Sequence, residues 1–167
     1  MIRKIASSIT GSEMELVQNG LIWTKENLRM EESENKNQLF RQRTAEEIIK
    51  SKFITGCTDA ALAFISLMRA RKIPAVFVET IDKKWLESKN EVPIYGHVYV
   101  EVFLDSKWYL TNPMYGKTEK TNKPRERVIF AKGLDSCDIG ITNFSDLKQK
   151  FLVFRNKWRQ KNLSNGG

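Results

Sequence analysis

The stretch TGCTDAALAFISLMRARK, residues 55–72, decides the fold of this chain. From Ala60 onward it is rich in Ala, Leu and Met and apolar on nearly every side, which predicts a helix buried at the centre of the molecule. The stretch ends in Arg69, Arg71 and Lys72, and cations suit the negative end of a helix dipole. The sequence therefore predicts a central helix whose N-terminus lies at or just before Cys57.

Helices are predicted on both sides of this central one. Apolar residues at helical spacing predict a helix over residues 14–28. Thr44 and Glu47 form a capping box, which predicts that a second helix starts there. The last helix is predicted over residues 145–161, where apolar residues again recur at helical spacing.

Between the central and last helices the pattern changes to that of strands. The predicted strands are residues 74–80, 98–104, 108–111 and 128–131. A turn at residues 105–107 joins the middle two into a hairpin. Helices come first, then an antiparallel sheet, then a terminal helix, and this order predicts an α+β fold rather than a doubly wound α/β fold.

Composition favours one soluble domain. With 167 residues, 41% of them hydrophobic, the chain can form a single core. We expect residues 1–161 to form the domain and residues 162–167 to be a disordered tail. The apolar runs are far shorter than the roughly 20 residues that cross a bilayer, and no signal peptide is evident. A cytoplasmic protein with no membrane partner is therefore expected.

Cysteine and charge usage narrow the function classes. Two cysteines, Cys57 and Cys137, cannot build a disulfide framework, and with a single histidine a zinc site is not expected. The net charge is +8. The excess gathers in a loop (Lys117, Lys120, Lys123, Arg125, Arg127) and near the C-terminus (Lys148, Lys150, Arg155, Lys157, Arg159, Lys161). Such regions can attract nucleic acid or an acidic partner, and a solvated basic surface is the alternative.

Cys57 is a candidate nucleophile because of its place in the chain. A thiol attacks as the thiolate, which the positive end of a helix favours. The free N–H groups of a helix N-terminus can also hold the oxyanion that forms on an attacked carbonyl. Gly56, just before it, carries no side chain that would block access. An inert, buried core cysteine is the alternative.

His97 and Asn112 complete a candidate constellation. His97 is the only histidine in the chain, so it is the sole imidazole that can serve Cys57 as a base. It begins one strand of the predicted hairpin and Asn112 ends the other, so the two are expected to lie close together. The Asn112 oxygen can then accept the second ring N–H of His97 and orient the ring. A surface histidine and an ordinary turn asparagine before Pro113 are the alternatives.

With these residues identified, the chain resembles the transglutaminase-like superfamily of papain-like cysteine enzymes. Residues 43–82 contain Gly-x-Cys-x-Asp at the start of a helix and Arg-x-x-x-Ile-Pro-Ala at its end. Residues 96–116, GHVYVEVFLDSKWYLTNPMYG, resemble the second and third motifs of that family. A weaker likeness lies at residues 133–141. The resemblance implies a papain-like/transglutaminase-like α+β fold, with N-terminal helices and a buried central helix packed on an antiparallel sheet.

The resemblance also implies a function. It makes Cys57 the nucleophile of an acyl-transfer enzyme that cleaves amide bonds in a protein or peptide through a thioester, with His97 as base and acid and no cofactor. Water as acceptor gives a peptidase or amidase, and an amine gives a transamidase. Hydrolysis is slightly favoured, because nothing marks an amine site. Asn112 stands where the family usually has Asp, although papain-like proteases use Asn.

Three aromatic residues are candidate substrate contacts. Trp85 is expected in the loop before His97 and can belong to a lid. Trp108 is either a core residue or a substrate contact, and Tyr99 stands where the family often has Trp. Asp59 is expected to support the N-terminus of the central helix. No chemistry is assigned to Cys137.

A catalytically inactive binding module is the second hypothesis. In that case the fold persists, Asn112 marks a decayed site, and the basic loop and C-terminal helix bind nucleic acid or an acidic protein. Alkylation of Cys57 that depends on His97 favours the enzyme over this alternative.

Overall fold

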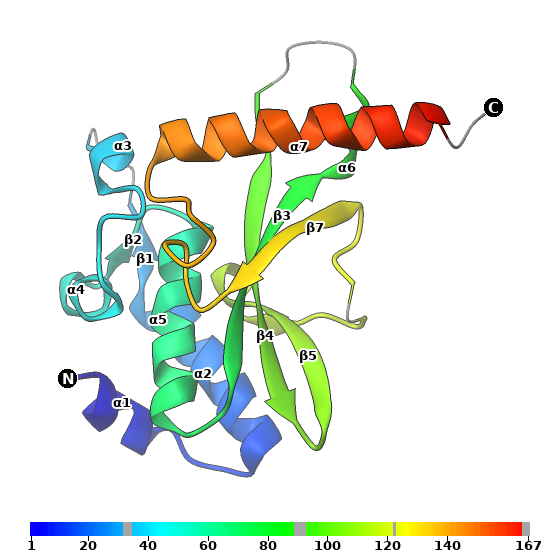
Figure 1. Cartoon of the computed structure of the whole chain (residues 1–167). Coiled ribbons are helices and arrows are strands. Elements are labelled where there is room, and N and C mark those ends of the chain that lie inside the picture. The colour runs from blue at the N-terminus through cyan, green and yellow to red at the C-terminus, as the bar shows by residue number, and fades with distance from the viewer. Residues whose placement is uncertain (32–34, 89–92, 122, 165–167) are drawn as a thin grey trace.

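The computed structural model describes residues 1–31, 35–88, 93–121 and 123–164. A five-stranded antiparallel sheet stands against a group of helices, and a long C-terminal helix crosses one end of the sheet (Figure 1). The helices are α1 (Ile2–Ser8), α2 (Glu13–Asn27), α3 (Lys36–Leu39), α4 (Ala45–Ser51), α5 (Cys57–Ala70), α6 (Lys83–Glu87), the short 3-10 helix η1 (Pro113–Tyr115) and α7 (Phe144–Ser164). The strands are β1 (Arg29–Met30), β2 (Phe53–Ile54), β3 (Ala75–Asp82), β4 (Gly96–Leu104), β5 (Lys107–Asn112), β6 (Lys117–Thr118) and β7 (Arg127–Gly133).

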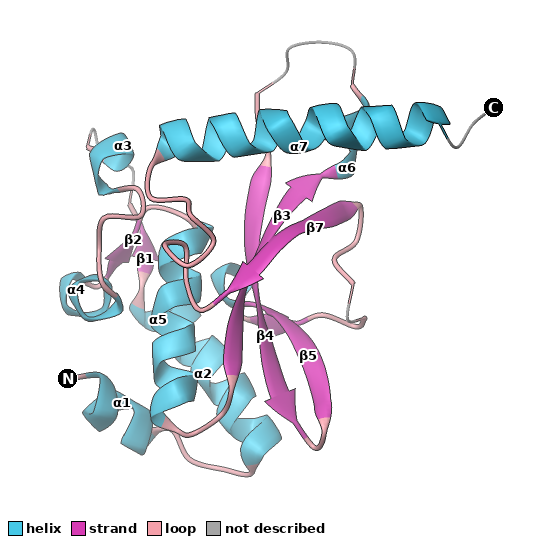
Figure 2. Ribbon diagram, viewed as in Figure 1, coloured by secondary structure: helices cyan, strands magenta, loops and turns pink. Residues whose placement is uncertain are grey.

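Helix α5 is the buried central helix that the sequence predicts. It begins at Cys57, directly after the extended N-cap residue Gly56. The chain leaves the helix through Lys72, which adopts a left-handed conformation, and Pro74 precedes the next strand. Most residues of α5 are buried, and α1, α2 and α4 pack around it (Figure 2). The α+β arrangement, with an antiparallel sheet beside a central helix, is confirmed.

The sheet has the strand order β6-β5-β4-β3-β7, and α5 packs against its central strands β3 and β4. Alternation along β4 divides its residues between the two faces. Val98, Val100 and Val102 belong to the main core cluster, which also contains residues of α5. Tyr99 belongs to a separate small cluster with Val78 and Leu110. The site below forms where β4 begins and β5 ends.

Helix α7 packs on a second apolar cluster at the end of the sheet where β4 begins. Phe151 of α7 is fully buried there together with Trp85 and Leu86 of α6. Arg155 and Arg159 of α7 both donate hydrogen bonds to the Ser88 carbonyl, and Arg159 also donates to that of Leu86. These contacts join α7 to α6, so two of the basic residues near the C-terminus stabilise the fold.

The structure departs from the sequence prediction in short elements. The segment expected to be a loop over residues 82–96 contains α6, and its residues 89–92 lie outside the described part. Helices α1 and α3 were not predicted, because seven and four residues are too few to show a clear helical period. Helix α7 ends at Ser164 rather than at residue 161, and residues 165–167 of the expected tail are not described.

None of the described helices combines the length and apolar character that crossing a membrane requires.

Candidate active site

Cys57 is the first residue of α5, and its sulfur lies beside the start of β4. The thiol is partly buried and accepts a hydrogen bond from the backbone N–H of Val98. The sulfur therefore contacts the backbone of the residue that directly follows His97 in the chain. A Cβ atom added at Gly56 would meet nothing within 4 Å, so open space lies beside the residue that precedes Cys57.

Asp59 anchors the segment that carries Cys57. Its Oδ2 atom accepts the backbone N–H and the hydroxyl of Thr55, both at 2.8 Å. The same oxygen lies 2.5 Å from Nη2 of Arg43, and both side chains of this ion pair are largely buried. The sequence predicts that Asp59 supports the helix electrostatically. The structure adds specific hydrogen bonds that hold the turn before Cys57 in place.

His97 and Asn112 meet as the hairpin geometry predicts. Nε2 of His97 lies 3.1 Å from Oδ1 of Asn112, and the two residues are only 8% and 3% exposed. Because an amide oxygen only accepts hydrogen bonds, this contact selects the neutral tautomer that carries its hydrogen on Nε2. The lone pair of Nδ1 then remains as the basic site of the ring.

The backbone and two aromatic rings hold the imidazole further. The hydroxyl of Thr80 on β3 donates to the His97 carbonyl at 2.7 Å. The Tyr99 ring meets the imidazole edge to face, with centroids 4.8 Å apart. The Tyr115 ring stacks on it at 5.9 Å. Tyr99 therefore lies beside His97, and its contact with substrate stays a prediction; Tyr115 is a neighbour that the sequence did not indicate.

A buried ion pair between Glu79 and Arg41 lies close to Cys57 and was missed at the sequence level. Glu79 stands on β3 opposite Val98, it is 1% exposed, and its carboxylate pairs with the Arg41 guanidinium. Burial raises the pKa of Glu79 above its ordinary value, and the Arg41 charge opposes that rise. A signal was present, because Glu79 is the one charged residue in the apolar run of residues 75–81 and a buried charge needs a partner.

The electrostatics differ from the sequence expectation. Burial raises the pKa of the Cys57 thiol, and the negative charge of Glu79 raises it further. The Val98 and Cys57 N–H groups and the Arg41 charge act in the opposite direction but do not reverse the shift. Burial also lowers the pKa of His97, and the charges of Arg127 and Lys117 contribute to the same effect. Both shifts oppose the thiolate that the helix position was expected to favour, so the resting site holds a neutral thiol and a neutral imidazole.

Two of the three aromatic candidates lie elsewhere. Trp85 is 2% exposed in α6 and packs on Phe151, so it belongs to the apolar core rather than to a lid loop. Trp108 lies opposite Phe103 near the hairpin turn, the far end of β5 from Asn112, and it is 38% exposed. Strand length separates it from His97 because each residue advances the chain by about 3.3 Å.

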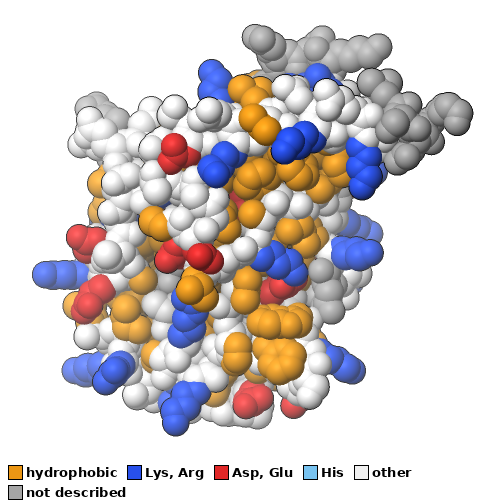
Figure 3. Space-filling view, viewed as in Figure 1, with side chains coloured by type: hydrophobic (Ala, Val, Ile, Leu, Met, Phe, Trp, Pro, Cys, Tyr) orange, Lys and Arg blue, Asp and Glu red, His pale blue; other side chains and the backbone are white. Residues whose placement is uncertain are grey.

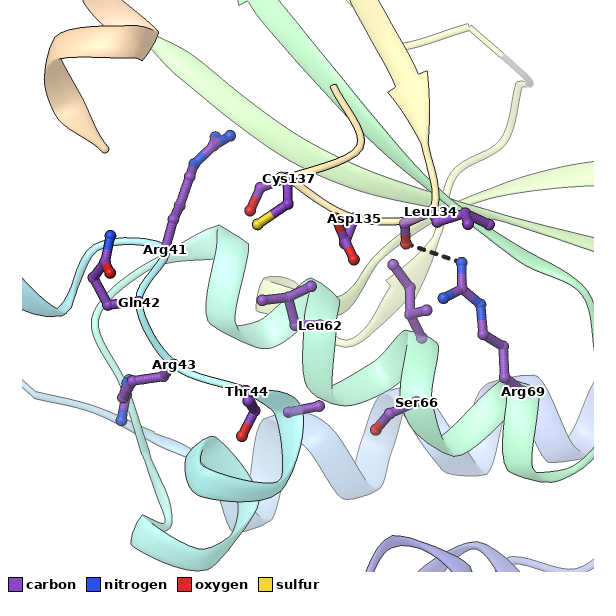
Figure 4. A pocket seen from close by; sticks show the side chains of 13 residues that line it. Arg41, Gln42, Arg43, Thr44, Leu62, Ser66, Arg69, Leu134, Asp135 and Cys137 are labelled. Atoms are coloured by element: carbon purple, nitrogen blue, oxygen red, sulfur yellow. Dashed lines mark hydrogen bonds between the residues drawn. The ribbon is translucent and has the colours of Figure 1, made fainter. Parts of the chain in front are cut away.

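Cys137 and Glu101 lie outside this arrangement. Cys137 is exposed in the wall of a hollow between the α3–α4 segment, α5 and the β7–α7 connection, and Cys57 is not among its lining residues (Figure 4). Glu101 pairs with Lys132 at 2.7 Å. Among residues 1–31, 35–88, 93–121 and 123–164, no three His, Cys, Asp or Glu side chains come close enough to hold a metal ion.

Comparison with known proteins agrees with this fold and motif set. The model of the transglutaminase-like superfamily matches residues 3–113, so the chain belongs to that superfamily. The chain is similar to the solved structure of a candidate cysteine protease from Cytophaga hutchinsonii, with a TM-score of 0.62 and 20% sequence identity over 84% of this chain. The match covers 44% of the Cytophaga chain, so the chain spans less than half of that protein's length.

A second solved structure and the curated sequences were also compared with this chain. LapG of Legionella pneumophila has a TM-score of 0.40 and 14% identity, with 93% of this chain and 94% of LapG covered. No protein among the curated sequences matches this chain significantly. At 20% identity the Cytophaga structure shows the fold alone, so the chemistry must be argued from the residues of the site.

Proposed function

We propose that this chain is a cysteine-dependent enzyme that cleaves amide bonds in a peptide or protein through a thioester on Cys57. One observation carries the proposal. The Cys57 sulfur, at the tip of the central helix, is hydrogen-bonded to the residue after His97, whose ring is oriented by Asn112. These contacts support Cys57 as nucleophile, His97 as base and Asn112 as orienting residue, the three roles that cysteine acyl transfer uses.

The first half of the reaction follows from the neutral resting state. Because the Cys57 thiol is protonated at neutral pH, His97 acts as a general base during attack rather than by holding a preformed thiolate. The sulfur forms a bond to the carbonyl carbon while its proton moves to Nδ1 of His97. The imidazolium then gives this proton to the amide nitrogen as the C–N bond breaks, leaving an acyl group on the sulfur.

The second half regenerates the thiol. Water approaches the thioester, and His97 takes one of its protons while the oxygen bonds to the acyl carbon. The C–S bond breaks and the proton returns to the sulfur. A primary amine in place of water gives transamidation. Water is proposed as the acceptor, because nothing in the sequence marks a dedicated amine site.

The test is to trap the covalent intermediate. A library of quenched fluorescent peptides identifies a cleaved sequence, and rapid acid quenching followed by mass spectrometry locates the acyl group. We expect it on Cys57, with turnover lost in Cys57→Ala and retained in Cys137→Ser. Adding a primary amine shows whether a transamidation product competes with hydrolysis. Turnover that survives in Cys57→Ala, or an acyl group found on Cys137, would contradict the proposal.

The inactive binding module remains the second candidate, and two observations favour it. The raised pKa of Cys57 makes the thiol a weaker nucleophile at neutral pH, and Asn112 brings no charge to stabilise an imidazolium. The absence of turnover across the whole library, together with Cys57 alkylation that does not change in His97→Ala, would decide for this candidate.

A further inference from the structure

A hollow of about 630 Å³ adjoins the site on the side of the histidine. Its inner wall is formed by Asn112 and Tyr99, which contact the His97 ring, and by Tyr115, which stacks on that ring. The rest of the wall comes from β6 and the loop that follows it. We call it the basic hollow, and its further lining residues are Lys117, Thr118, Glu119, Lys120, Thr121, Lys123 and Arg125.

The charge of this hollow is strongly one-sided. Among the described residues that line it, four are Lys or Arg and one, Glu119, is acidic. Glu119 lies 3.5 Å from Lys117 and so offsets one of these cations. Close to the site, the charges of Arg127 and Lys117 lower the pKa of His97, and the charge of Glu119 raises it.

The second basic region of the chain lies on α7 and takes part in the fold. Arg155 and Arg159 of α7 are used within the fold, where they donate to carbonyls of the α6 segment. Figure 3 shows Lys and Arg side chains along α7 at the top of this face, with hydrophobic side chains between them. The basic hollow is therefore the place where positive charge, aromatic surface and the candidate active site coincide.

We propose that the basic hollow binds an acidic stretch of the polypeptide substrate next to the amide bond that Cys57 attacks. This inference rests on the proposed function. A polypeptide fits better than a nucleic acid, because Asn112 and Tyr99 line the hollow and also contact His97, so one chain can fill the hollow and present its amide bond to Cys57. Asp or Glu side chains meet the lysines and Arg125, and the Tyr115 ring offers an apolar surface to the substrate backbone.

The strength of these ion pairs sets the expected preference for an acidic over a neutral peptide. Exposed ion pairs are individually weak and are screened by salt. Several of them acting together in a concave site give a preference of about tenfold to a hundredfold for an acidic over a neutral peptide. The preference should shrink as ionic strength rises.

Binding can be measured without turnover in Cys57→Ala. Isotope-labelled protein is titrated with a peptide that contains a run of glutamates and with the same peptide carrying glutamines, and amide shifts are followed by NMR. We expect the glutamate peptide to shift the signals of residues 115–121 and 123–127 and to bind at least about tenfold more tightly than the glutamine peptide. Equal binding of both peptides, or shifts confined to α7, would overturn the inference.

A matched pair of charge reversals controls for net charge. Lys120→Glu/Lys123→Glu changes the hollow, and Lys148→Glu/Lys157→Glu makes the same charge change on the exposed face of α7. The first pair should weaken glutamate-peptide binding about tenfold or more, whereas the second should leave it within about twofold. Equal effects of the two pairs would mean long-range attraction only, and a DNA oligonucleotide that binds the hollow more tightly than the peptide would replace the inference with a nucleic-acid site.

Measuring peptide cleavage alongside binding tests the acidic preference and the proposed hydrolysis separately. If wild-type protein cleaves neutral and acidic peptides with equal kcat/KM, the function stands and the acidic preference is wrong. If nothing is cleaved but the glutamate peptide still binds the hollow in a salt-dependent way, the site is a binding site and the proposed hydrolysis is wrong.

Discussion

The oxygen of Asn112 lies 3.1 Å from Nε2 of His97 and selects the tautomer whose free lone pair is on Nδ1. This contact orients the base without adding charge. It therefore separates two roles that an Asp combines in other members of the superfamily, namely fixing the ring and stabilising its protonated form. Because the chain has one histidine, the consequences can be read from a single imidazole signal.

We expect Asn112→Asp to raise the pKa of His97 from its depressed value toward and beyond the ordinary value of about 6.5, since an adjacent carboxylate stabilises imidazolium. The reaction needs the neutral ring, so activity is lost as pH falls through this pKa. The acid limb of kcat/KM should therefore move to higher pH in Asn112→Asp. NMR titration of the imidazole measures the shift directly.

Asn112→Ala is the matched control and should lower the pKa of His97 further, because the hydrogen bond to Asn112 raises that pKa. Identical titration of all three proteins would show that this contact does not form in solution.

Alkylation of Cys57 should be slow at neutral pH and accelerate only above the ordinary thiol pKa of about 8.5, because burial and Glu79 hold its pKa high. Removing the negative charge in Glu79→Gln lowers that pKa, so the whole rate profile should move to lower pH. Iodoacetamide labelling followed by peptide mapping gives the profile, with the exposed Cys137 as an internal reference. Glu101→Gln, which removes a carboxylate paired with Lys132, should leave it unchanged. Rapid labelling of wild-type Cys57 near pH 6 would refute the raised pKa.

Arg41 and Glu79 should be coupled strongly in a double-mutant cycle. Arg41→Met leaves a buried carboxylate unpaired and Glu79→Leu leaves a buried guanidinium unpaired, so each should lower the free energy of unfolding by about 3–5 kcal/mol. The double variant removes both charges and should recover a large part of this loss. Urea denaturation of the four proteins gives the coupling energy. Strictly additive losses would mean that the two side chains do not interact.

Asp59→Ala should destabilise the protein by about 3 kcal/mol, because Arg43 loses its buried partner and Thr55 loses the acceptor of its N–H and hydroxyl. For a chain of this size that corresponds to a fall in Tm of roughly 6–12 °C. Thr55→Val removes only the hydroxyl bond and should cost about 1 kcal/mol. Thermal unfolding followed by circular dichroism compares the two. An Asp59→Ala protein as stable as Thr55→Val would show that the ion pair contributes little.

Replacing Trp85 should destabilise the protein much more than replacing Trp108. Trp85→Ala removes a fully buried ring and should cost about 3–5 kcal/mol of unfolding free energy. Trp108→Ala removes a ring that is 38% exposed at the hairpin end and should cost about 1 kcal/mol, with kcat/KM unchanged. Denaturation midpoints and steady-state kinetics test both. A large fall in kcat/KM for Trp108→Ala at unchanged stability would place substrate at the hairpin end.

Sequence patterns were sufficient wherever one local period dominates. The apolar helix from Cys57, the Thr44 capping box and the alternation along residues 98–104 were predicted because each depends on neighbours a few residues apart. The closeness of His97 and Asn112 could also be predicted, since a tight hairpin turn fixes the register of its two strands. The short helix α6 was not predicted, because five residues are too few to show a helical period.

The sequence by itself determined the superfamily, the central helix and the order of the sulfur, imidazole and amide along the chain. Only the tertiary structure decided the protonation state of that site, because the pKa values of Cys57 and His97 depend on burial and on charges far away in sequence. Glu79 and Arg41 are 38 residues apart, yet they act on one thiol. Electrostatic energies depend on distance through space and on exclusion of water, and neither quantity exists until the chain has folded.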